Sequence, residues 1–409
     1  MNPKGYRTTL LLLVIGSAGY YLCRSSFSVA KPLLLDAFSD IDKVKLGAIA
    51  STGTLFYAIG KLVHGPLADR FGGKPLFLYG MLGAIGFSFL FGLGGPPLFY
   101  LAWAGNRFVQ SAGWGGMVKI VGQWSTPMKY GAAMSVVSLS YLFGDFASRM
   151  LLGSWVANGA QWHDLFVSSA IGLAMIAVVT IALLKEKPAE PIAPVVREET
   201  SPLGSRNIFR LPTFWMVCFL SFVFTLLRET FNEWTPTYLN EAAKLTSAAA
   251  GQASSIFPLF GGIGVLAVGF LSDRLKDISN PIRRLNYVPI GLTLSAIFLA
   301  VLGLVPGLSQ TAIVVLVGAV GFCSIGPYSL LAGAISLDFG GSEKSASAAG
   351  MIDGIGYFGG ILSGIAMGSL AQSAGWNSAM GSLGVMCAVV AIITWSILKV
   401  HSKKFAYVA

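Results

Sequence analysis

Residues 19–32 read GYYLCRSSFSVAKP and place one arginine, Arg24, inside a long apolar run. The residues before it, LLLVIGSAGYYLC, and the FSV after it are typical of a helix that crosses a membrane. An ionisable side chain at that depth costs several kcal/mol on most scales, so such residues mark functional sites. Arg24 is therefore the first candidate for a ligand-binding residue.

The same stretch recurs 204 positions later in the chain. Five residues are matched at this spacing: Arg24 with Arg228, Pro32 with Pro236, Gly65 with Gly269, Asp69 with Asp273, and Arg70 with Arg274. The chain is therefore expected to consist of two similar halves, each burying one arginine at the same place. We expect the halves at residues 1–185 and 212–409, joined by a cytoplasmic linker at 186–211 that is rich in proline and charge.

The composition indicates a membrane protein. Of 409 residues, 54% are hydrophobic and only 11% are charged, which soluble proteins do not match. Apolar runs long enough to cross a hydrocarbon core of about 30 Å are expected at about 8–35, 46–66, 75–95, 98–123, 131–157, 165–184, 212–239, 251–271, 287–306, 311–336, 346–372 and 378–398. The predicted fold is thus all-α, with twelve transmembrane helices in two pseudo-symmetric six-helix bundles, and the first run is expected to remain as helix 1 rather than to be cleaved.

The basic residues predict the orientation of these helices, because cytoplasmic loops carry an excess of lysine and arginine. If both termini face the cytoplasm, eighteen such residues lie on the cytoplasmic side, and three, Lys43, Lys45 and Lys244, lie on the other. Both termini are therefore expected to be cytoplasmic. The net charge of +10 then reflects topology, and nucleic acid is not an expected partner.

Two short motifs are expected to have structural roles, the first in the cytoplasmic loop after the second span and the second in the fourth span, with Arg107 inside the membrane. Residues 65–74 read GPLADRFGGK, with a degenerate copy, GFLSDR, at 269–274, and residues 106–116 read NRFVQSAGWGG. They resemble the loop 2–3 and helix 4 signatures of the major facilitator superfamily. Gating or structural roles are expected for the charged residues of these segments and for one nearby lysine: Asp69, Arg70, Asp273, Arg274, Arg107 and Lys119.

The two repeated arginines, Arg24 and Arg228, are expected to face each other where the halves meet. A guanidinium is always charged and offers a planar fork that suits the oxygens of a phosphate or carboxylate. Two such forks suit a doubly charged phosphoryl group. The alternative is that each arginine pairs with an acidic residue as a structural bridge, for which Glu229 and Glu233 flank Arg228.

Further polar residues are expected near the arginines. Tyr21 lies one helical turn before Arg24, and Tyr57 and Lys61 share one face of the second span. Lys61 is expected to bind ligand, with snorkelling to the cytoplasmic end as the alternative. Tyr357 either donates its hydroxyl to the ligand or fills space.

The fifth and eleventh spans carry the remaining charged candidates. Asp145 and Arg149 are four residues apart, in the order that favours an intrahelical ion pair, and are expected to neutralise each other. Asp353 is expected to pair across the cavity, to contact a sugar hydroxyl, or to carry a proton.

A more specific family resemblance extends over nearly the whole chain. The segments GYYLCRSSFSVAKP, YAIGKLVHGPLAD, GWGGMVKIVGQW, LLRETFNEWTPTYL and GYFGG resemble the organophosphate:phosphate antiporters. The resemblance implies that Arg24 and Arg228 bind the phosphate, assisted by Lys61, Tyr57 and Tyr357. The chain departs from the glycerol-phosphate exchanger in the fifth span, where a histidine is replaced by Tyr141 or Leu142, and in the fourth, where Trp-Pro-Pro becomes Trp-Gly-Gly at 114–116. These changes lie where the organic part of the ligand is expected.

The expected function is exchange of an organic phosphate, with a sugar phosphate favoured, for inorganic phosphate by alternating access of the two halves. A proton symporter of organic anions using Asp353 or Glu233, and a transporter-like sugar-phosphate sensor, are the alternatives. No cofactor, metal site or enzyme activity is expected, because the cysteines lie in spans at unrelated spacings and the histidines are scattered. We expect a monomer in a bacterial inner membrane, with an organelle membrane as the alternative.

Overall fold

The computed structural model of the chain describes residues 3–125, 127–188, 211–274, 282–331 and 335–406. Within these ranges the side chains of residues 3–4, 127–132, 273–274, 282–283, 337–347 and 400–406 lie outside the description. Every regular element of the described residues is a helix, as the sequence predicts. In an apolar layer a helix is favoured because it satisfies its backbone hydrogen bonds within the segment.

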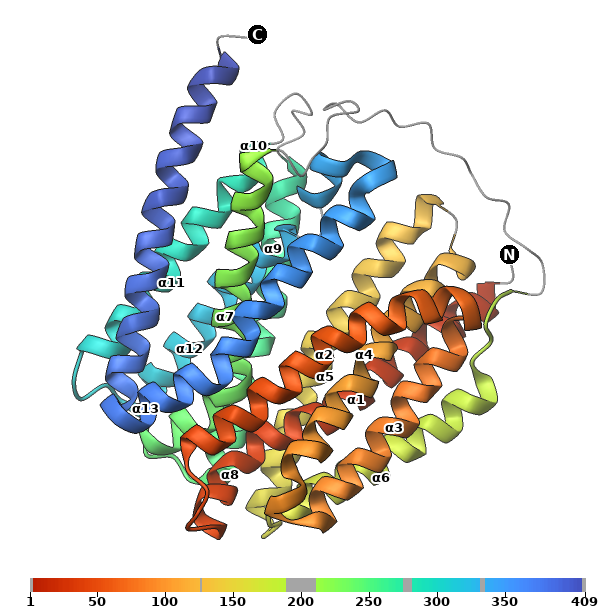
Figure 1. Cartoon of the computed structure of the whole chain (residues 1–409), viewed down its shortest axis with the longest axis vertical. Coiled ribbons are helices and arrows are strands. Elements are labelled where there is room, and N and C mark those ends of the chain that lie inside the picture. The colour runs from red at the N-terminus through yellow and green to blue at the C-terminus, as the bar shows by residue number, and fades with distance from the viewer. Residues whose placement is uncertain (1–2, 126, 189–210, 275–281, 332–334, 407–409) are drawn as a thin grey trace. The chain divides into compact units, whose positions relative to one another are not determined.

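The chain divides into two compact units, each of which is described by itself. The first comprises Met1–Val196 and Glu233–Ser255. Its helices are α1 (Pro3–Ala37), α2 (Lys43–Phe71), α3 (Gly73–Gly94), the short 3-10 helix η1 (Pro96–Leu98), α4 (Phe99–Trp124), α5 (Pro127–Ala157), α6 (Trp162–Leu183) and α8 (Ser247–Ala253) (Figure 1). The second comprises Arg197–Asn232 and Ile256–Ala409.

The helices of the second unit are α9 (Ile256–Arg274), α10 (Ile282–Leu285), α11 (Tyr287–Leu304), α12 (Gln310–Leu330) and α13 (Ser336–Ala406). α7 (Pro212–Glu241) contributes its residues up to Asn232 to this unit and the rest to the first. The division into halves expected from the sequence, 1–185 and 212–409, remains a prediction, and most of the expected linker lies outside the described residues.

Helix starts follow from capping side chains. The carboxylate of Asp42 accepts a hydrogen bond from the backbone N–H of Lys45 at 2.8 Å and begins α2. The hydroxyls of Thr246 and Ser309 accept from backbone N–H groups in the first turns of α8 and α12. Such caps satisfy N–H groups that have no partner within the helix.

The 71 residues of α13 cannot form one membrane span. A straight helix of that length would measure about 107 Å, against a hydrocarbon core of about 30 Å. Figure 1 shows the chain of α13 reversing direction before its C-terminal part, and Gly375 has a φ of +79°, which glycine adopts readily. The two expected spans at 346–372 and 378–398 therefore lie on either side of this glycine.

All the expected spans overlap helices. Among the described residues, nine segments are long and apolar enough to cross a membrane. α4 and α5 overlap two further expected spans, at 98–123 and 131–157. The expectation of twelve spans is consistent with these helices, and the expected cytoplasmic position of both termini remains a prediction.

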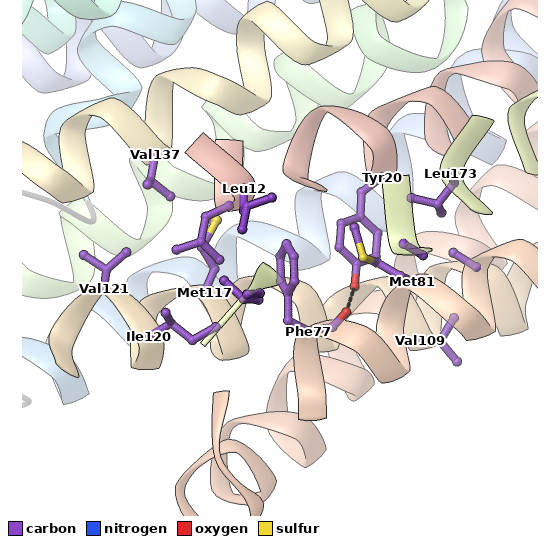
Figure 2. Packing of buried hydrophobic residues seen from close by; sticks show 14 of the residues in the cluster. Leu12, Tyr20, Phe77, Met81, Val109, Met117, Ile120, Val121, Val137 and Leu173 are labelled. Atoms are coloured by element: carbon purple, nitrogen blue, oxygen red, sulfur yellow. Dashed lines mark hydrogen bonds between the residues drawn. The ribbon is translucent and has the colours of Figure 1, made fainter. Parts of the chain in front are cut away.

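The core of the first unit lies between α1, α3, α4, α5 and α6 (Figure 2). Phe77 and Met81 of α3 pack with Leu12 of α1 and Ile120 of α4 among its buried residues. The hydroxyl of Tyr20 donates a hydrogen bond to the carbonyl oxygen of Phe77 in this core, which joins α1 to α3. Membrane helices associate through such close packing and interhelical hydrogen bonds, because lipid is as apolar as the helix surface.

α3 and α4 approach each other closely at a pair of glycines. A Cβ atom added to Gly116 would lie 2.5 Å from the carbonyl oxygen of Gly73 and 2.8 Å from the backbone nitrogen of Phe77. Real Cβ atoms are essentially never that near to other heavy atoms. Only glycine fits at Gly116 without moving the backbone of α3.

We expect Gly116→Ala to lower the thermal unfolding midpoint of the detergent-solubilised protein, because α3 and α4 must move apart to admit the methyl group. Gly86→Ala is the matched control. It lies in α3 at an exposed position where a Cβ meets nothing within 4 Å, and it should leave the midpoint unchanged or raise it, since alanine favours a helix over glycine by about 1 kcal/mol. Equal midpoints for both variants would contradict the close approach.

Candidate functional site

Three basic side chains lie around the ring of Tyr57 in the first unit. The guanidinium carbon of Arg107 is 4.7 Å from the ring centroid, that of Arg24 is 5.3 Å away, and the Nζ atom of Lys61 is 5.7 Å away. Cations at such distances are attracted by the negative face of an aromatic ring. We call Tyr57, Arg24, Lys61 and Arg107 the Tyr57 cluster.

Two further tyrosines extend the Tyr57 cluster through Arg24. The guanidinium carbon of Arg24 lies 5.4 Å from the centroid of the Tyr21 ring, and this ring lies 6.0 Å from that of Tyr141. α1, α2, α4 and α5 thus bring together six of the residues singled out from the sequence. The tyrosine hydroxyls and the basic groups can donate hydrogen bonds to an anion.

Burial separates the members of the cluster into two kinds. Arg107 is 0% exposed and Tyr57 is 9% exposed, whereas Arg24, Lys61, Tyr21 and Tyr141 are partly exposed. The partly exposed groups have free surface with which to contact a ligand.

The second unit holds a cluster around Arg228 of α7. Its Nη2 atom lies 2.9 Å from Oε1 of the fully buried Glu229, and its guanidinium carbon lies 4.8 Å from the centroid of the Tyr328 ring. The hydroxyl of Tyr328 donates to Oδ1 of Asp353 at 3.3 Å. Tyr357, one turn after Asp353 on α13, is buried. The ion pair with Glu229 agrees with the alternative expectation that Arg228 forms a structural bridge to an acidic residue. Arg228 also contacts Tyr328, whose ring carries a hydroxyl.

Sequence reasoning missed Tyr328. It follows the Gly-Pro pair at 326–327 in α12 and carries no charge, so only its packing against Arg228 and Asp353 distinguishes it from other tyrosines in the spans.

Asp145 and Arg149 of α5 form a buried ion pair. The Nε atom of Arg149 donates to Oδ1 of Asp145 at 2.9 Å, and the hydroxyl of Ser25 donates to the same oxygen. Nη1 of Arg149 also donates to the hydroxyls of Ser28 and Ser254, at 3.2 and 3.3 Å. Three hydroxyls from two segments, α1 and the end of α8, thus contact the pair. A buried charge requires such partners for stability.

A second buried ion pair, Lys31 with Glu233, was not foreseen. The Nζ atom of Lys31 lies 2.7 Å from Oε2 of Glu233 and donates to its backbone carbonyl at 2.9 Å, and the two side chains are 0% and 6% exposed. The rings of Phe27 and Trp234 lie 4.8 and 4.3 Å from the same nitrogen. Lys31 was visible in the sequence as a second cation within the run that holds Arg24, but its partner lies 202 residues away.

The charged residues of the GPLADR motif lie at the end of α2. Oδ1 of Asp69 is 2.8 Å from Nζ of Lys119, in a pair that is largely exposed, and the guanidinium of the exposed Arg70 lies over the ring of Phe71. Asp273 and Arg274 end α9, and their side chains lie outside the described residues.

A metal site is not apparent in the part of the chain that the structure describes, since it holds no group of three or more His, Cys, Asp or Glu side chains suited to one. The four cysteines are free and buried.

Residues 13–285, more than half of the chain, match the sequence profile of the family described as the Major Facilitator Superfamily. The chain is 26% identical over 432 residues to the "Probable hexose phosphate transport protein" of Chlamydia muridarum (strain MoPn / Nigg), covering 97% of this chain and 92% of that one. It is 25% identical over 387 residues to the "Glucose-6-phosphate exchanger SLC37A2" of Bos taurus, covering 82% and 77%.

Solved structures agree on the fold. The crystal structure of a POT family transporter in complex with 5-aminolevulinic acid matches with a TM-score of 0.77 over 98% of this chain and 97% of that chain. The sequence identity is 16%, so the likeness shows the fold alone.

We expect Lys31→Met or Glu233→Gln alone to lower the thermal midpoint strongly, because breaking a buried ion pair costs about 3–5 kcal/mol. The double variant should recover much of the loss, since neither charge is then left alone. The matched control is Lys43 with Glu241, a pair at 2.8 Å whose side chains are 15% and 32% exposed, for which the coupling should be about 1 kcal/mol or less. Additive losses at Lys31 and Glu233 would contradict a coupled pair.

Proposed function

The chain belongs to the Major Facilitator Superfamily, and we propose that it exchanges an organic phosphate, a sugar phosphate such as glucose 6-phosphate, for inorganic phosphate. It is an integral membrane protein and a transporter rather than an enzyme. Its membrane in this proposal is a bacterial inner membrane, where it acts as a monomer. The names of the relatives, a hexose phosphate transport protein and a glucose-6-phosphate exchanger, support the substrate class.

The observation that carries the proposal is the set of cations with tyrosines in the first unit. Arg24 and Lys61 are partly exposed beside the rings of Tyr21 and Tyr57. Guanidinium and ammonium groups recognise phosphate oxygens, the first as a bidentate fork and the second as a point charge. In the proposal Arg24 and Arg228 bind the phosphoryl group that organic and inorganic phosphate share, assisted by Lys61 and Tyr57.

The organic part of the substrate is recognised, in this proposal, by Asp353, Tyr357 and Tyr141, to which we add Tyr328. The hydrogen bond from the Tyr328 hydroxyl to Asp353 supports this role, because it holds an acceptor oxygen near Arg228. A carboxylate can accept hydrogen bonds from sugar hydroxyls. In this proposal, differences in affinity among phosphorylated substrates are then determined by these four residues.

Exchange follows from the charge of the site. A bound phosphate neutralises Arg24 and Arg228 and so favours closure of the two halves, whereas the empty site retains its cations. Alternating access of the halves 1–185 and 212–409 then proceeds only with an anion bound. Asp69, Arg70, Lys119, Asp273 and Arg274 are assigned to gating at the cytoplasmic side, and Asp145 and Arg149 to structure.

Exchange is preferred to proton symport through Glu233 because the carboxylate of Glu233 is paired with Lys31. Counterflow in proteoliposomes loaded with inorganic phosphate, tested against a panel of phosphorylated sugars, decides among the candidates. Uptake that depends on a proton gradient without internal phosphate would establish a symporter. Saturable binding with no flux would establish a sensor.

We expect Arg24→Lys to lose most phosphate exchange although the charge is kept, because lysine lacks the bidentate fork. Arg7→Lys is the matched control, since Arg7 is exposed on the same helix and its replacement should leave exchange unchanged. Near-normal exchange by a well-expressed Arg24→Lys protein would falsify the role of Arg24.

We expect Asp353→Asn to change the ranking among phosphorylated sugars and to leave phosphate-for-phosphate exchange largely intact. A hydrogen bond to a neutral hydroxyl contributes about 0.5–1.5 kcal/mol, so the shift in relative rates should be about tenfold at most. Both exchange modes are measured on the same vesicles. Collapse of phosphate self-exchange would show instead that Asp353 serves gating or charge balance.

A further inference from the structure

Arg107 is the member of the Tyr57 cluster that is buried completely. Its guanidinium carbon is the closest of the three cations to the Tyr57 ring, at 4.7 Å. At 0% exposure it is one of the largest fully buried side chains in the chain. A side chain with no exposed surface cannot meet a ligand that enters from solvent, so any effect of Arg107 on binding must pass through its neighbours.

The interface between α2 and α4 explains why Arg107 lies beside the Tyr57 ring. A Cβ atom on Gly53 would lie 2.5 Å from the ring of Trp103 and 2.9 Å from Cγ of Arg107. Gly53 thus makes room for the stem of Arg107 one turn before Tyr57, and Trp103 lies one turn before Arg107. One turn further along α4, Oγ of Ser111 is 2.8 Å from Nδ1 of His64 on α2. The register of the two helices therefore directs the guanidinium of Arg107 to Tyr57.

The Tyr57 ring also lies beside the cations of Arg24 and Lys61, which are partly exposed. Like charges repel one another strongly at short range in a medium of low dielectric constant. An aromatic face offsets part of that repulsion for each cation that contacts it. The orientation of the Tyr57 ring consequently determines where the two partly exposed cations can lie.

We propose that Arg107 is a positioning residue for anion binding: it holds the Tyr57 ring so that the ring presents Arg24 and Lys61 to the phosphoryl group. The identity of the anion rests on the proposed function. The positioning itself rests on the contacts of the buried arginine with the ring. Since Arg107 acts on the shared phosphoryl group, it affects organic and inorganic phosphate alike.

The first test measures KM and the maximal rate of exchange for both substrates. Arg107→Gln should raise KM for inorganic phosphate and for glucose 6-phosphate by the same factor, about 2- to 30-fold, the range to which cation–π energies correspond. Arg107→Lys should restore part of the affinity, because an ammonium also binds a ring face. Equal KM values for wild type and Arg107→Gln would overturn the proposal.

A second test does not depend on the folding of an Arg107 variant. Position 57 is replaced by phenylalanine and then by phenylalanines with one, two and three ring fluorines, which weaken the negative ring face stepwise at nearly constant shape. KM for both substrates should rise at each step while the yield of folded protein stays constant. The same replacements at Tyr100, an exposed ring of α4, are the control and should leave KM unchanged.

The outcomes separate this proposal from the proposed function. If KM does not change across the fluorinated phenylalanines at position 57, Arg107 has no positioning role, even where the wild type exchanges phosphate. A wild type that binds inorganic phosphate by calorimetry but does not exchange it refutes the exchanger, and the fluorine series is then measured as binding affinity. A wild type that binds neither inorganic phosphate nor glucose 6-phosphate overturns both.

Discussion

Charge inside an apolar layer is stable only where another group compensates it, and this requirement governs the interior of the chain. Each buried or half-buried cation meets it differently. The carboxylate of Asp145 and the hydroxyls of Ser28 and Ser254 contact Arg149. Glu233 pairs with Lys31, and the ring of Tyr57 lies beside Arg24 and Arg107. These contacts join α1 to α2, α5 and the last part of α7, and α4 to α2. The polar residues thus specify which helices are neighbours, while apolar packing holds the helices together.

The helical fold could be predicted from sequence because membrane depth leaves few options for the backbone. Apolar runs predict the positions of the helices. They also predict two spans within α13, because each of its two apolar runs has the length of one membrane crossing. Local site geometry was also predictable. Tyr21 with Arg24 and Asp145 with Arg149 are three and four residues apart, and helix periodicity alone places such residues on one face.

Contacts between distant segments could not be predicted in this way. Glu233 was considered as a partner of Arg228, but it pairs with Lys31, and Arg228 pairs with its neighbour Glu229. Residues five apart lie roughly 140° apart around a helix, which directs Glu233 away from Arg228. The surroundings of Arg107 and Tyr328 depend on contacts with other helices. Arg107 lies beside Tyr57 and Gly53 of α2, and Tyr328 lies beside Arg228 of α7 and Asp353 of α13.

Two ion pairs of unequal burial hold the last part of α7 within the first unit. Lys31 with Glu233 is almost completely buried, whereas Lys43 with Glu241, two helical turns further along α7, lies near the surface. Dissolved ions screen charges at a surface far more than charges in an interior. Ionic strength therefore acts mainly on the outer pair. Concentrated salt weakens the attachment of the end of α7 to Lys43 of α2, whereas the attachment of Glu233 to Lys31 of α1 keeps its strength.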